Sequence, residues 1–247
     1  MTVSDDASLA RELATGAGRV LLALRATEPG ADPSTLGARG DAAAQAYLLD
    51  ELRRRVPADA ILSEEMADDA ERLSADRVWI IDPLDGTREY REGRTDWAVH
   101  VALWADGSLR AGAVAMPAED QVFVSEPAPQ LAPPSDGRPR VLVSRSRPPA
   151  EADVVRSALD GELLPLGSAG AKTMAVLTGF GDIYVHSGGQ YEWDTAAPAV
   201  VAAAAGLDVS RLDGSPLEYN RPDPWSPEFL VCRPELTERV LSALADA

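Results

Sequence analysis

The residues best suited to chemistry lie in the segment RVWIIDPLDGTREY, residues 77–90, where two aspartates follow an apolar run. The run VWII predicts a buried strand with Asp82 at its carboxyl end, and Pro83 predicts the end of its hydrogen-bond ladder. Asp85 is expected on the following loop, where the bend turns both carboxylates into one pocket beside the Leu84 carbonyl. Two adjacent carboxylates repel each other unless a cation neutralises them, and all-oxygen ligation suits Mg²⁺. An ordinary Asp-Gly turn with a solvated acid is the competing interpretation.

The same segment offers a place for an anion next to the acids. Gly86 and Thr87 present backbone N–H groups at the start of a turn, which suits a phosphate. The letters DGT also occur in haloacid-dehalogenase-type enzymes, which need a nucleophilic aspartate two residues before the aspartate of that motif. Asp82 stands three residues before Asp85, so Asp82 is not placed as that nucleophile.

Other acids lie where a helix or strand is expected to begin or end. Glu64, followed by Glu65, ends the apolar run of ILSEE. Asp194 is predicted at a helix N-cap, with Pro198 still in the first turn of that helix. Asp41 is predicted to cap the helix DAAAQAYLLDELRRRV. Capping is a sufficient role for each aspartate, and a solvated loop is a sufficient environment for Glu65.

Taken together, these segments resemble the lithium-sensitive, magnesium-dependent phosphatases of the inositol monophosphatase superfamily. The pattern of that superfamily is a Glu-Glu pair, then W-x-[IV]-D-P-[IL]-D-G-T, then a distant W-D before a helix. The chain has a Glu-Glu pair in ILSEE, then WIIDPLDGT and WDTAAPAVV. The resemblance covers nearly the whole chain and implies two or three Mg²⁺ ions. The metal ligands that it implies are Glu64, Asp82, the Leu84 carbonyl, Asp85 and Asp194.

The resemblance also implies a pair of residues, Asp41 and Thr87, that orients the attacking water. The superfamily has T-x-A-D before a helix where the chain has GARGD, so the aspartate is kept and the threonine is absent. The implied reaction is metal-assisted in-line attack of water on a phosphate, inhibited by Li⁺ in competition with Mg²⁺. The implied fold is the layered α/β sugar-phosphatase architecture, an α+β arrangement with layers in the order αβαβα.

The second half of the chain resembles one group of that superfamily, the CysQ-like 3′-phosphoadenosine 5′-phosphate phosphatases, which act in sulfate assimilation. GSAGAKTMAVLTG and EWDTAAP are similar to the G-x-G-x-K and W-D-T-x-A-P segments of that group, and VSRSRP resembles its V-S-R-S-H. Lys172, the only lysine of the chain, stands at a predicted helix start that suits a second phosphate. The substrate-binding positions expected on this basis are Gly86, Thr87, Ser144, Ser168, Gly170, Lys172 and Glu192.

Two other functions stay open. A broader phosphatase for inositol-1-phosphate or fructose-1,6-bisphosphate would use the same metals with a different second half. A non-catalytic metabolite-binding protein of the same fold would not need several mutually repelling carboxylates. His100, inside WAVHVAL, is expected to be a sheet residue, and His186, inside DIYVHSG, is ambiguous. Gln190 and Glu192, near the W-D, are candidates for contacts with sugar hydroxyls, which the sequence alone does not establish.

Composition narrows the class of protein and its partners. The chain has 247 residues and a formal net charge of −17, with a pI near 4.5. This charge excludes nucleic acid polymers and anionic membranes as main partners and leaves a small phosphorylated molecule. The sequence has no transmembrane-length apolar run and no signal-peptide pattern, so a cytoplasmic protein is expected. Cys232, the single cysteine, is expected to be a buried thiol. A homodimer is left open.

The order of the predicted elements indicates two halves. Helices are expected over residues 6–26 and 41–56, and WAVHVALWADGSLRAGAVAM indicates antiparallel strands with a hairpin at ADGS. The proline-rich segment 127–139 predicts an exposed connector. Residues 1–130 would form an α+β half that holds most of the acids. Residues 139–247 would form an α/β half with substrate-binding elements and the last metal ligand.

Overall fold

The computed structural model describes residues 2–28, 30, 32–134 and 137–246. The first part of the chain contains α1 (Val3–Thr27), α2 (Pro33–Arg55), β1 (Ala60–Ser63), the 3₁₀ helix η1 (Ala70–Ser74), β2 (Arg77–Asp85), α3 (Thr87–Arg91), β3 (Ala98–Ala105), β4 (Ser108–Met116), the 3₁₀ helix η2 (Pro117–Glu119) and β5 (Gln121–Val124). The second part contains β6 (Arg140–Ser144), α4 (Ala150–Leu159), β7 (Glu162–Leu166), α5 (Ala169–Leu177), β8 (Ile183–Tyr191), α6 (Glu192–Ala204), β9 (Asp208–Ser210), β10 (Trp225–Cys232) and α7 (Pro234–Ala245).

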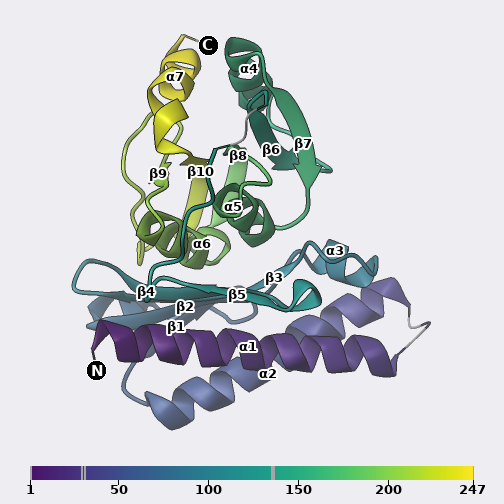
Figure 1. Ribbon diagram of the computed structural model, residues 1–247. Helices are drawn as coiled ribbons and strands as arrows, with labels where there is room; N and C mark the ends of the chain where they lie inside the picture. The colour runs from purple at the N-terminus through teal and green to yellow at the C-terminus, as the bar shows by residue number, and fades with distance from the viewer. Residues whose placement is uncertain (1, 29, 31, 135–136, 247) are drawn as a thin grey trace.

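These elements stack in five layers (Figure 1). One sheet has the strand order β1-β2-β3-β4-β5, and the other has the order β7-β6-β8-β10-β9. Helices α1 and α2 cover the outer face of the first sheet, α5 and α6 lie between the sheets, and α4 and α7 cover the outer face of the second. The expected αβαβα order is therefore confirmed.

Each interface between layers has its own apolar core. One core joins α1 and α2 to the first sheet, a second joins both sheets through α5 and α6, and a third joins the second sheet to α4 and α7. Strand β2 contributes to the first two cores because it is covered on both faces, and its residues 78–81 are fully buried. This double burial explains why the run VWII is apolar without alternation.

The first two helices begin earlier than the sequence pattern predicts. Helix α1 matches the expected range closely and begins with a capping box between Thr2 and Asp5. Helix α2 begins at Pro33, with Asp32 as its N-cap. Asp41 therefore lies inside α2 and is not its cap, so the prediction of a helix that begins at Asp41 is wrong. Gly37 and Gly40 precede Asp41 inside the helix. Because glycine has a low helix propensity, the first turns of α2 were not predicted from the sequence.

The sequence suggested that strand β2 ends at Pro83, but the strand continues to Asp85. Asp82 pairs with His100 of β3 and Asp85 pairs with Ala98, so the strand has one extra residue between the two pairs. Such a bulge bends the strand and redirects its side chains. Asp85 is therefore held by a sheet rather than by a free loop, which corrects the loop prediction.

Helix α6 also begins before the predicted position. Tyr191 is the N-cap, and Asp194 occupies the third helical position, where its Oδ2 accepts a hydrogen bond from the Tyr191 N–H at 2.7 Å. Pro198 is the seventh residue of α6, so the prediction that it lies in the first turn is wrong. Asp194 thus caps α6 from the third position of the helix, and its side chain lies at the start of the helix.

The predicted connector lies between β5 and β6, and most of its described residues are exposed. Two of its residues, 135 and 136, lie outside the described part of the chain. The connector is anchored at Ala132, which donates to the Leu177 carbonyl and accepts from Arg233, and at Pro139, whose carbonyl accepts from the Glu162 N–H. Cys232 is buried with a free thiol, as expected. Within the described residues, no helix is long and apolar enough to cross a membrane.

Candidate active site

Three of the predicted metal ligands meet where β2 contacts α6. Asp82 and Asp85 come from the end of β2, and Asp194 comes from the first turn of α6. One carboxylate oxygen of each residue lies within 4.8 Å of the corresponding oxygens of the other two. Asp82 is 1% exposed and Asp85 is 7% exposed. Segments more than a hundred residues apart in sequence thus bring three carboxylates together.

The charges of these carboxylates oppose one another. Burial raises the pKa of Asp82 well above its usual value, and the nearby carboxylates of Asp85 and Asp194 act in the same direction. Burial also raises the pKa of Asp194 to about 6, and the Asp85 charge contributes to this increase. A hard cation with oxygen ligands satisfies such a set of buried carboxylates. The residues present therefore fit a divalent metal ion.

Asp85 differs from its two neighbours because donors surround one of its oxygens. Oδ2 accepts from Ser168 Oγ at 2.6 Å and from the Gly170 N–H at 2.7 Å, and it lies 3.1 Å from His100 Nε2. Although burial raises the pKa of Asp85, His100, Ser168 and the Gly170 N–H together lower it to about 2. Asp85 is thus held as an anion with a fixed orientation, which leaves Oδ1 for a metal ion.

His100 is the contact that the sequence did not predict. It is a fully buried residue of β3, as expected for a sheet residue, and its Nδ1 lies 3.1 Å from the Trp193 carbonyl oxygen. The signal in the sequence is a lone polar residue in the apolar run WAVHVAL. A polar side chain buried in a strand needs partners, and here the partners are Asp85 and the start of α6.

Glu64 follows the end of β1 and lies outside the group of three carboxylates. Although Glu64 is an exposed residue, the surrounding protein shields its carboxyl group enough to raise the pKa to about 8, and the charges of Asp194 and Glu65 contribute. Glu64 is therefore near the cluster but not part of its closest contacts.

Asp41 and Thr87 come together as a pair beside these acids. Thr87 Oγ1 lies 3.3 Å from Asp41 Oδ1 and 3.2 Å from the Leu84 carbonyl oxygen. Burial raises the pKa of Asp41 to about 7, and the charge of Glu65 adds to this effect. A carboxylate with a pKa near neutrality is suited to exchange a proton with water.

A cleft of about 530 Å³ opens beside the carboxylates. Asp85 and Asp194 line it, together with five of the predicted substrate-binding positions: Gly86, Thr87, Ser144, Ser168 and Lys172. The lining also contains residues that were not assigned to the site from the sequence: Arg88, Arg145, Arg147, Tyr184, Tyr191 and Trp225. The cleft therefore combines acidic, basic and aromatic side chains.

The arginines of the cleft differ in how much of their charge is free. Arg145 Nη2 contacts Glu89 Oε1 at 2.7 Å and Glu92 Oε2 at 2.8 Å, so acids neutralise it. Arg88 and Arg147 are exposed and form no ion pair with any residue that the structure describes. They provide free positive charge at the edge of a site in an acidic protein.

Lys172 lines the cleft but is only 4% exposed. Its Nζ donates to the Gly167 carbonyl at 3.0 Å and to the Ser168 carbonyl. The ammonium group also lies 4.9 Å from the centre of the Tyr184 ring. Burial lowers the pKa of Lys172 to about 8. One of its three N–H groups remains for a ligand.

Two predicted substrate-binding positions lie elsewhere. Gly170 does not line the cleft, because its N–H is bonded to Asp85 and a Cβ at this position would come within 2.2 Å of His100 Nε2. Glu192 is 1% exposed, and its carboxylate accepts from the Asn220 and Arg221 N–H groups. Glu192 therefore ties α6 to the loop before β10 and cannot reach a sugar in this arrangement.

His186 and Gln190 of β8 both line the cleft. His186 Nε2 lies 3.2 Å from the Gly189 carbonyl oxygen, and burial lowers the pKa of His186 to about 4. His186 is thus neutral at pH 7. Gln190 donates to the Tyr184 hydroxyl at 3.3 Å.

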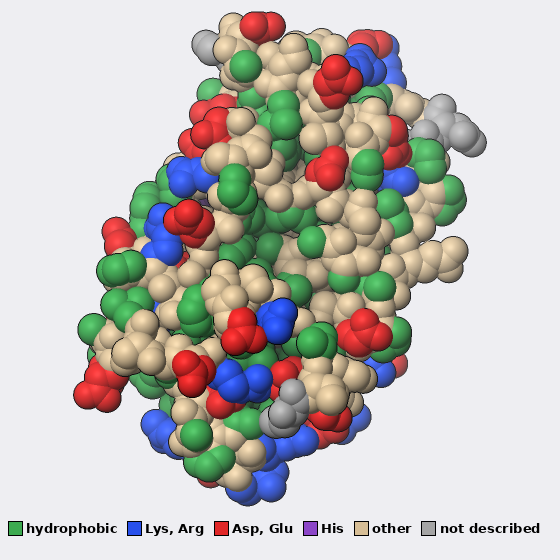
Figure 2. Space-filling view, turned by 90° about the vertical axis from the view of Figure 1, so that its left-hand side faces the viewer, with side chains coloured by type: hydrophobic (Ala, Val, Ile, Leu, Met, Phe, Trp, Pro, Cys, Tyr) green, Lys and Arg blue, Asp and Glu red, His purple; other side chains and the backbone are tan. Residues whose placement is uncertain are grey.

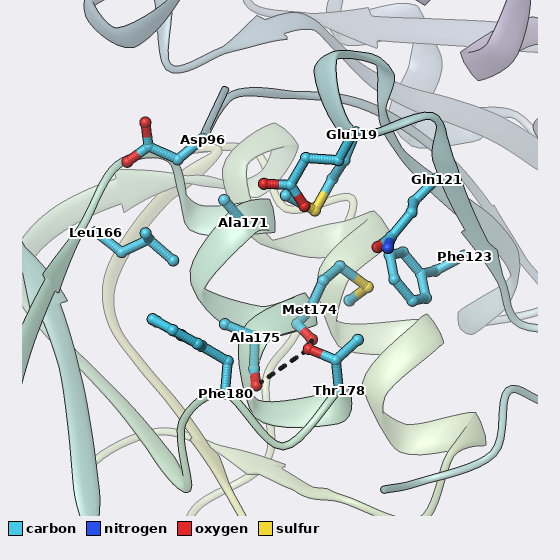
Figure 3. A pocket seen from close by; sticks show the side chains of 11 residues that line it. Asp96, Glu119, Gln121, Phe123, Leu166, Ala171, Met174, Ala175, Thr178 and Phe180 are labelled. Atoms are coloured by element: carbon cyan, nitrogen blue, oxygen red, sulfur yellow. Dashed lines mark hydrogen bonds between the residues drawn. The ribbon is translucent and has the colours of Figure 1, made fainter. Parts of the chain in front are cut away.

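A second pocket, of about 240 Å³, lies on a different face of α5 (Figure 3). Its walls are mostly apolar and include Phe123, Met174 and the exposed Phe180. Asp96 stands at its edge, but that carboxylate already binds Arg94 and the Gly167 N–H. This pocket has no group of converging acids among the described residues, so the cleft beside Asp85 is the better candidate for catalysis.

A layered αβαβα fold with a buried carboxylate cluster beside a cleft defines a class of metal-dependent phosphatases. The profile described as the inositol monophosphatase family matches residues 4–247, and the chain belongs to this family. It is 50% identical over 243 residues to the 3′-phosphoadenosine 5′-phosphate phosphatase of Mycobacterium tuberculosis, a match that spans 94% of this chain and 90% of that protein.

More distant relatives agree with this assignment. The 3′(2′),5′-bisphosphate nucleotidase CysQ of Escherichia coli K12 is 32% identical over 192 residues, which cover 72% of this chain and 77% of that protein. The crystal structure of CysQ from Bacteroides thetaiotaomicron superposes with a TM-score of 0.79 at 25% identity, covering 93% of this chain and 97% of that one. The resemblance inferred from the sequence motifs is thus confirmed.

Proposed function

We propose that this protein is a Mg²⁺-dependent phosphatase that hydrolyses the 3′-phosphate of 3′-phosphoadenosine 5′-phosphate to give AMP and phosphate. The observation that supports this most strongly is the composition of one cleft. Three converging carboxylates can hold metal for one phosphate, and Lys172, Arg88 and Arg147 offer positive charge for another. The names of the bisphosphatase relatives agree with a substrate that carries two phosphates.

Asp82, Asp85 and Asp194 would hold the metal ions, with Glu64 and the Leu84 carbonyl as further ligands. When bound, Mg²⁺ supplies a water of lowered pKa and stabilises negative charge on the scissile phosphate. The donors on Asp85 Oδ2 fix the direction in which Oδ1 points. The metal charge also explains how an acidic protein accepts a polyanionic substrate.

Asp41 and Thr87 would position the attacking water. The Thr87 hydroxyl lies within hydrogen-bond distance of Asp41 Oδ1 and of the Leu84 carbonyl oxygen. When it donates its proton to one of these oxygens, the Thr87 oxygen can accept a hydrogen bond from the water. Asp41, with its pKa raised to about 7, can take the proton that the water loses. The backbone N–H groups of Gly86 and Thr87 would bind the phosphate oxygens at the start of α3.

The competing functions fit the structure less well. A phosphatase for inositol-1-phosphate needs the carboxylates but gives no role to the free arginines of the cleft. A non-catalytic binding protein would carry the cost of buried, mutually repelling carboxylates without using a metal. The proposal places the enzyme in the cytoplasm, which agrees with the free buried thiol of Cys232.

Phosphate release from 3′-phosphoadenosine 5′-phosphate tests the proposal. The wild-type protein should release phosphate with Mg²⁺ and lose this activity in EDTA. Asp194→Asn should remove nearly all turnover, because it deletes a ligand charge, while the isosteric amide can still accept the Tyr191 hydrogen bond that caps α6. Circular dichroism would confirm that the variant is folded. Activity in EDTA, or wild-type turnover in folded Asp194→Asn, would refute the metal assignment.

A further inference from the structure

Two aromatic residues at the cleft are exposed to solvent. Tyr191 is 41% exposed and Trp225 is 39% exposed, and both line the cleft that contains the carboxylates. Few other large apolar residues of the described chain are this exposed, and none of those lines the cleft: Val3, Leu73 and Phe180. Adjacent exposed aromatic side chains beside a catalytic centre indicate a binding surface rather than chance exposure.

The two rings are fixed relative to each other by the sheet. Tyr191 and Trp225 are directly opposite residues of the antiparallel pair β8–β10. Their rings meet edge to face, with centroids 5.6 Å apart and an interplanar angle of 82°. Tyr191 also stacks on Trp193, with a centroid distance of 4.7 Å and an angle of 9°. Contacts of this kind hold both rings in place before a ligand binds.

Gly189 gives Trp225 its position. A Cβ at residue 189 would come within 1.6 Å of the Trp225 ring, so the indole lies directly against the backbone of β8. Gly189 also has a φ of +95°, which disfavours any other residue there. The backbone N–H of Trp225 donates to Asp223 Oδ1 at 3.0 Å, which anchors the backbone at the start of β10. Trp225 is therefore a rigid surface, and little entropy is lost when a ligand covers it.

These rings are also directly connected to the catalytic centre. The Tyr191 N–H donates to Asp194 Oδ2 at 2.7 Å, so Tyr191 is the immediate neighbour of a proposed metal ligand. A nucleoside carries its phosphates on the ribose, and the base extends away from them. A phosphate beside Asp85 and Asp194 would therefore have its base within the same cleft, which Tyr191 and Trp225 also line.

We propose that Trp225 and Tyr191 form a stacking surface for the nucleobase of the substrate, with Trp225 as the principal contact. This inference rests on the proposed function, since it assumes a nucleotide substrate. A planar base presents a π-face to an exposed aromatic ring, and such stacking contributes to affinity without reading base identity. The surface would thus separate nucleotides from sugar or inositol phosphates while allowing several bases.

The kinetic test compares Trp225→Ala, Trp225→Phe and wild type on 3′-phosphoadenosine 5′-phosphate. Trp225→Ala should raise KM roughly tenfold, far more than it lowers kcat, because stacking contributes to binding and not to the chemical step. Trp225→Phe keeps an aromatic face and should restore most of the affinity. Phe180→Ala is the matched control, because it removes another exposed aromatic ring away from the cleft, and it should behave as wild type.

A spectroscopic test does not depend on whether the alanine variant folds. In the wild-type protein, AMP should quench part of the tryptophan fluorescence by stacking on Trp225, ribose 5-phosphate should not, and the AMP effect should disappear in Trp225→Phe. An unchanged KM in folded Trp225→Ala, or no quenching by AMP, would overturn the inference. If wild type quenches with AMP but does not hydrolyse the bisphosphate, the proposed function fails and the base-binding surface stands.

Discussion

Lys172 is a buried cation whose ammonium group binds backbone carbonyls, and the residue also lines the cleft. It donates to two carbonyls of the loop before α5 and keeps one N–H for an anion. Burial costs the charged form free energy, which is why the pKa of Lys172 falls to about 8. Under the proposed function, Lys172 would bind the second phosphate of the substrate at neutral pH and would lose its charge as the pH rises through about 8.

Lys172→Ala should therefore lower kcat/KM on 3′-phosphoadenosine 5′-phosphate by roughly ten- to a hundredfold, because a charge-assisted hydrogen bond is lost. Inositol-1-phosphate has no second phosphate, so its hydrolysis should change much less. In the wild-type protein, KM for the bisphosphate should rise as the pH passes about 8, because the protonated fraction of Lys172 falls. Steady-state kinetics on both substrates from pH 6.5 to 9.5 would measure these effects.

Arg147→Ala is the matched variant, because Arg147 lines the same cleft with an exposed and unpaired charge. If only Arg147→Ala loses activity selectively on the bisphosphate, Arg147 rather than Lys172 binds the second phosphate. Equal losses on both substrates in Lys172→Ala would show that Lys172 supports the loop at Gly167 and Ser168 instead.

At the scale of elements, the start of α5 holds the carboxylate of Asp85 in β2. Ser168 is the N-cap of α5, and its hydroxyl donates to Asp85 while accepting from the Ala171 N–H. Gly170 donates to the same carboxylate oxygen, and His100 Nε2 lies 3.1 Å from that oxygen. The packing of α5 against β2 and β3 therefore sets the direction of Asp85.

Gly170→Ala tests this coupling. Alanine favours a helix over glycine by about 1 kcal/mol, but its Cβ would lie 2.2 Å from His100 Nε2, so α5 or His100 must move. Overpacking of this kind costs about 1–3 kcal/mol. We expect a lower melting temperature and at least a roughly tenfold loss of kcat/KM, because Asp85 loses its partners. Gly137→Ala, at an exposed position with open space, is the control. Wild-type activity in Gly170→Ala would contradict the coupling.

How far the sequence predicts these elements depends on whether the determining contact is local. The strand before Asp82 and the layer order follow from local patterns, such as the apolar run VWII and the alternation of strands and helices. The bulge at Asp85 does not, because it depends on the register with β3 across His100 and Ala98. The role of Glu192 could not be predicted from local sequence either, because its carboxylate accepts hydrogen bonds from the distant backbone N–H groups of Asn220 and Arg221.

At the scale of the whole molecule, the chain carries a formal net charge of −17. On the face shown in Figure 2, acidic and basic side chains are interspersed. The concentrated negative charge lies inside, in the cluster between the layers. Without metal, the charges of Asp82 and Asp194 oppose folding, because the pKa values of these two residues are raised in the folded state.

The sign of the effect follows from Asp194, whose pKa rises from 3.8 to about 6 on folding. The folded state binds this proton more tightly, so its contribution to the free energy of unfolding decreases as the pH rises from 3.8 through 6. Mg²⁺ binds the deprotonated form and competes with protons at lower pH. Metal should therefore stabilise the protein more at pH 8 than at pH 5.5.

Melting curves with saturating Mg²⁺ and with EDTA measure this difference. At a concentration a hundred times Kd, binding contributes about 2.7 kcal/mol, which raises Tm by about 5–10 °C for a chain of this length. We expect a shift of this order at pH 8, a smaller one at pH 5.5, and a much reduced one in Asp194→Asn. A shift that is equal at both pH values, or unchanged in the variant, would place the metal elsewhere.

The most direct test of the central claim is the substrate preference of the purified wild-type protein. Values of kcat/KM should be measured at one Mg²⁺ concentration for 3′-phosphoadenosine 5′-phosphate, inositol-1-phosphate and fructose-1,6-bisphosphate. The cleft contains carboxylates, unpaired arginines and exposed aromatic rings. The proposed roles of these groups predict that kcat/KM for the nucleotide exceeds the other two values by roughly tenfold or more, since one such contact changes affinity by that factor. A higher kcat/KM for inositol-1-phosphate or fructose-1,6-bisphosphate would contradict the claim.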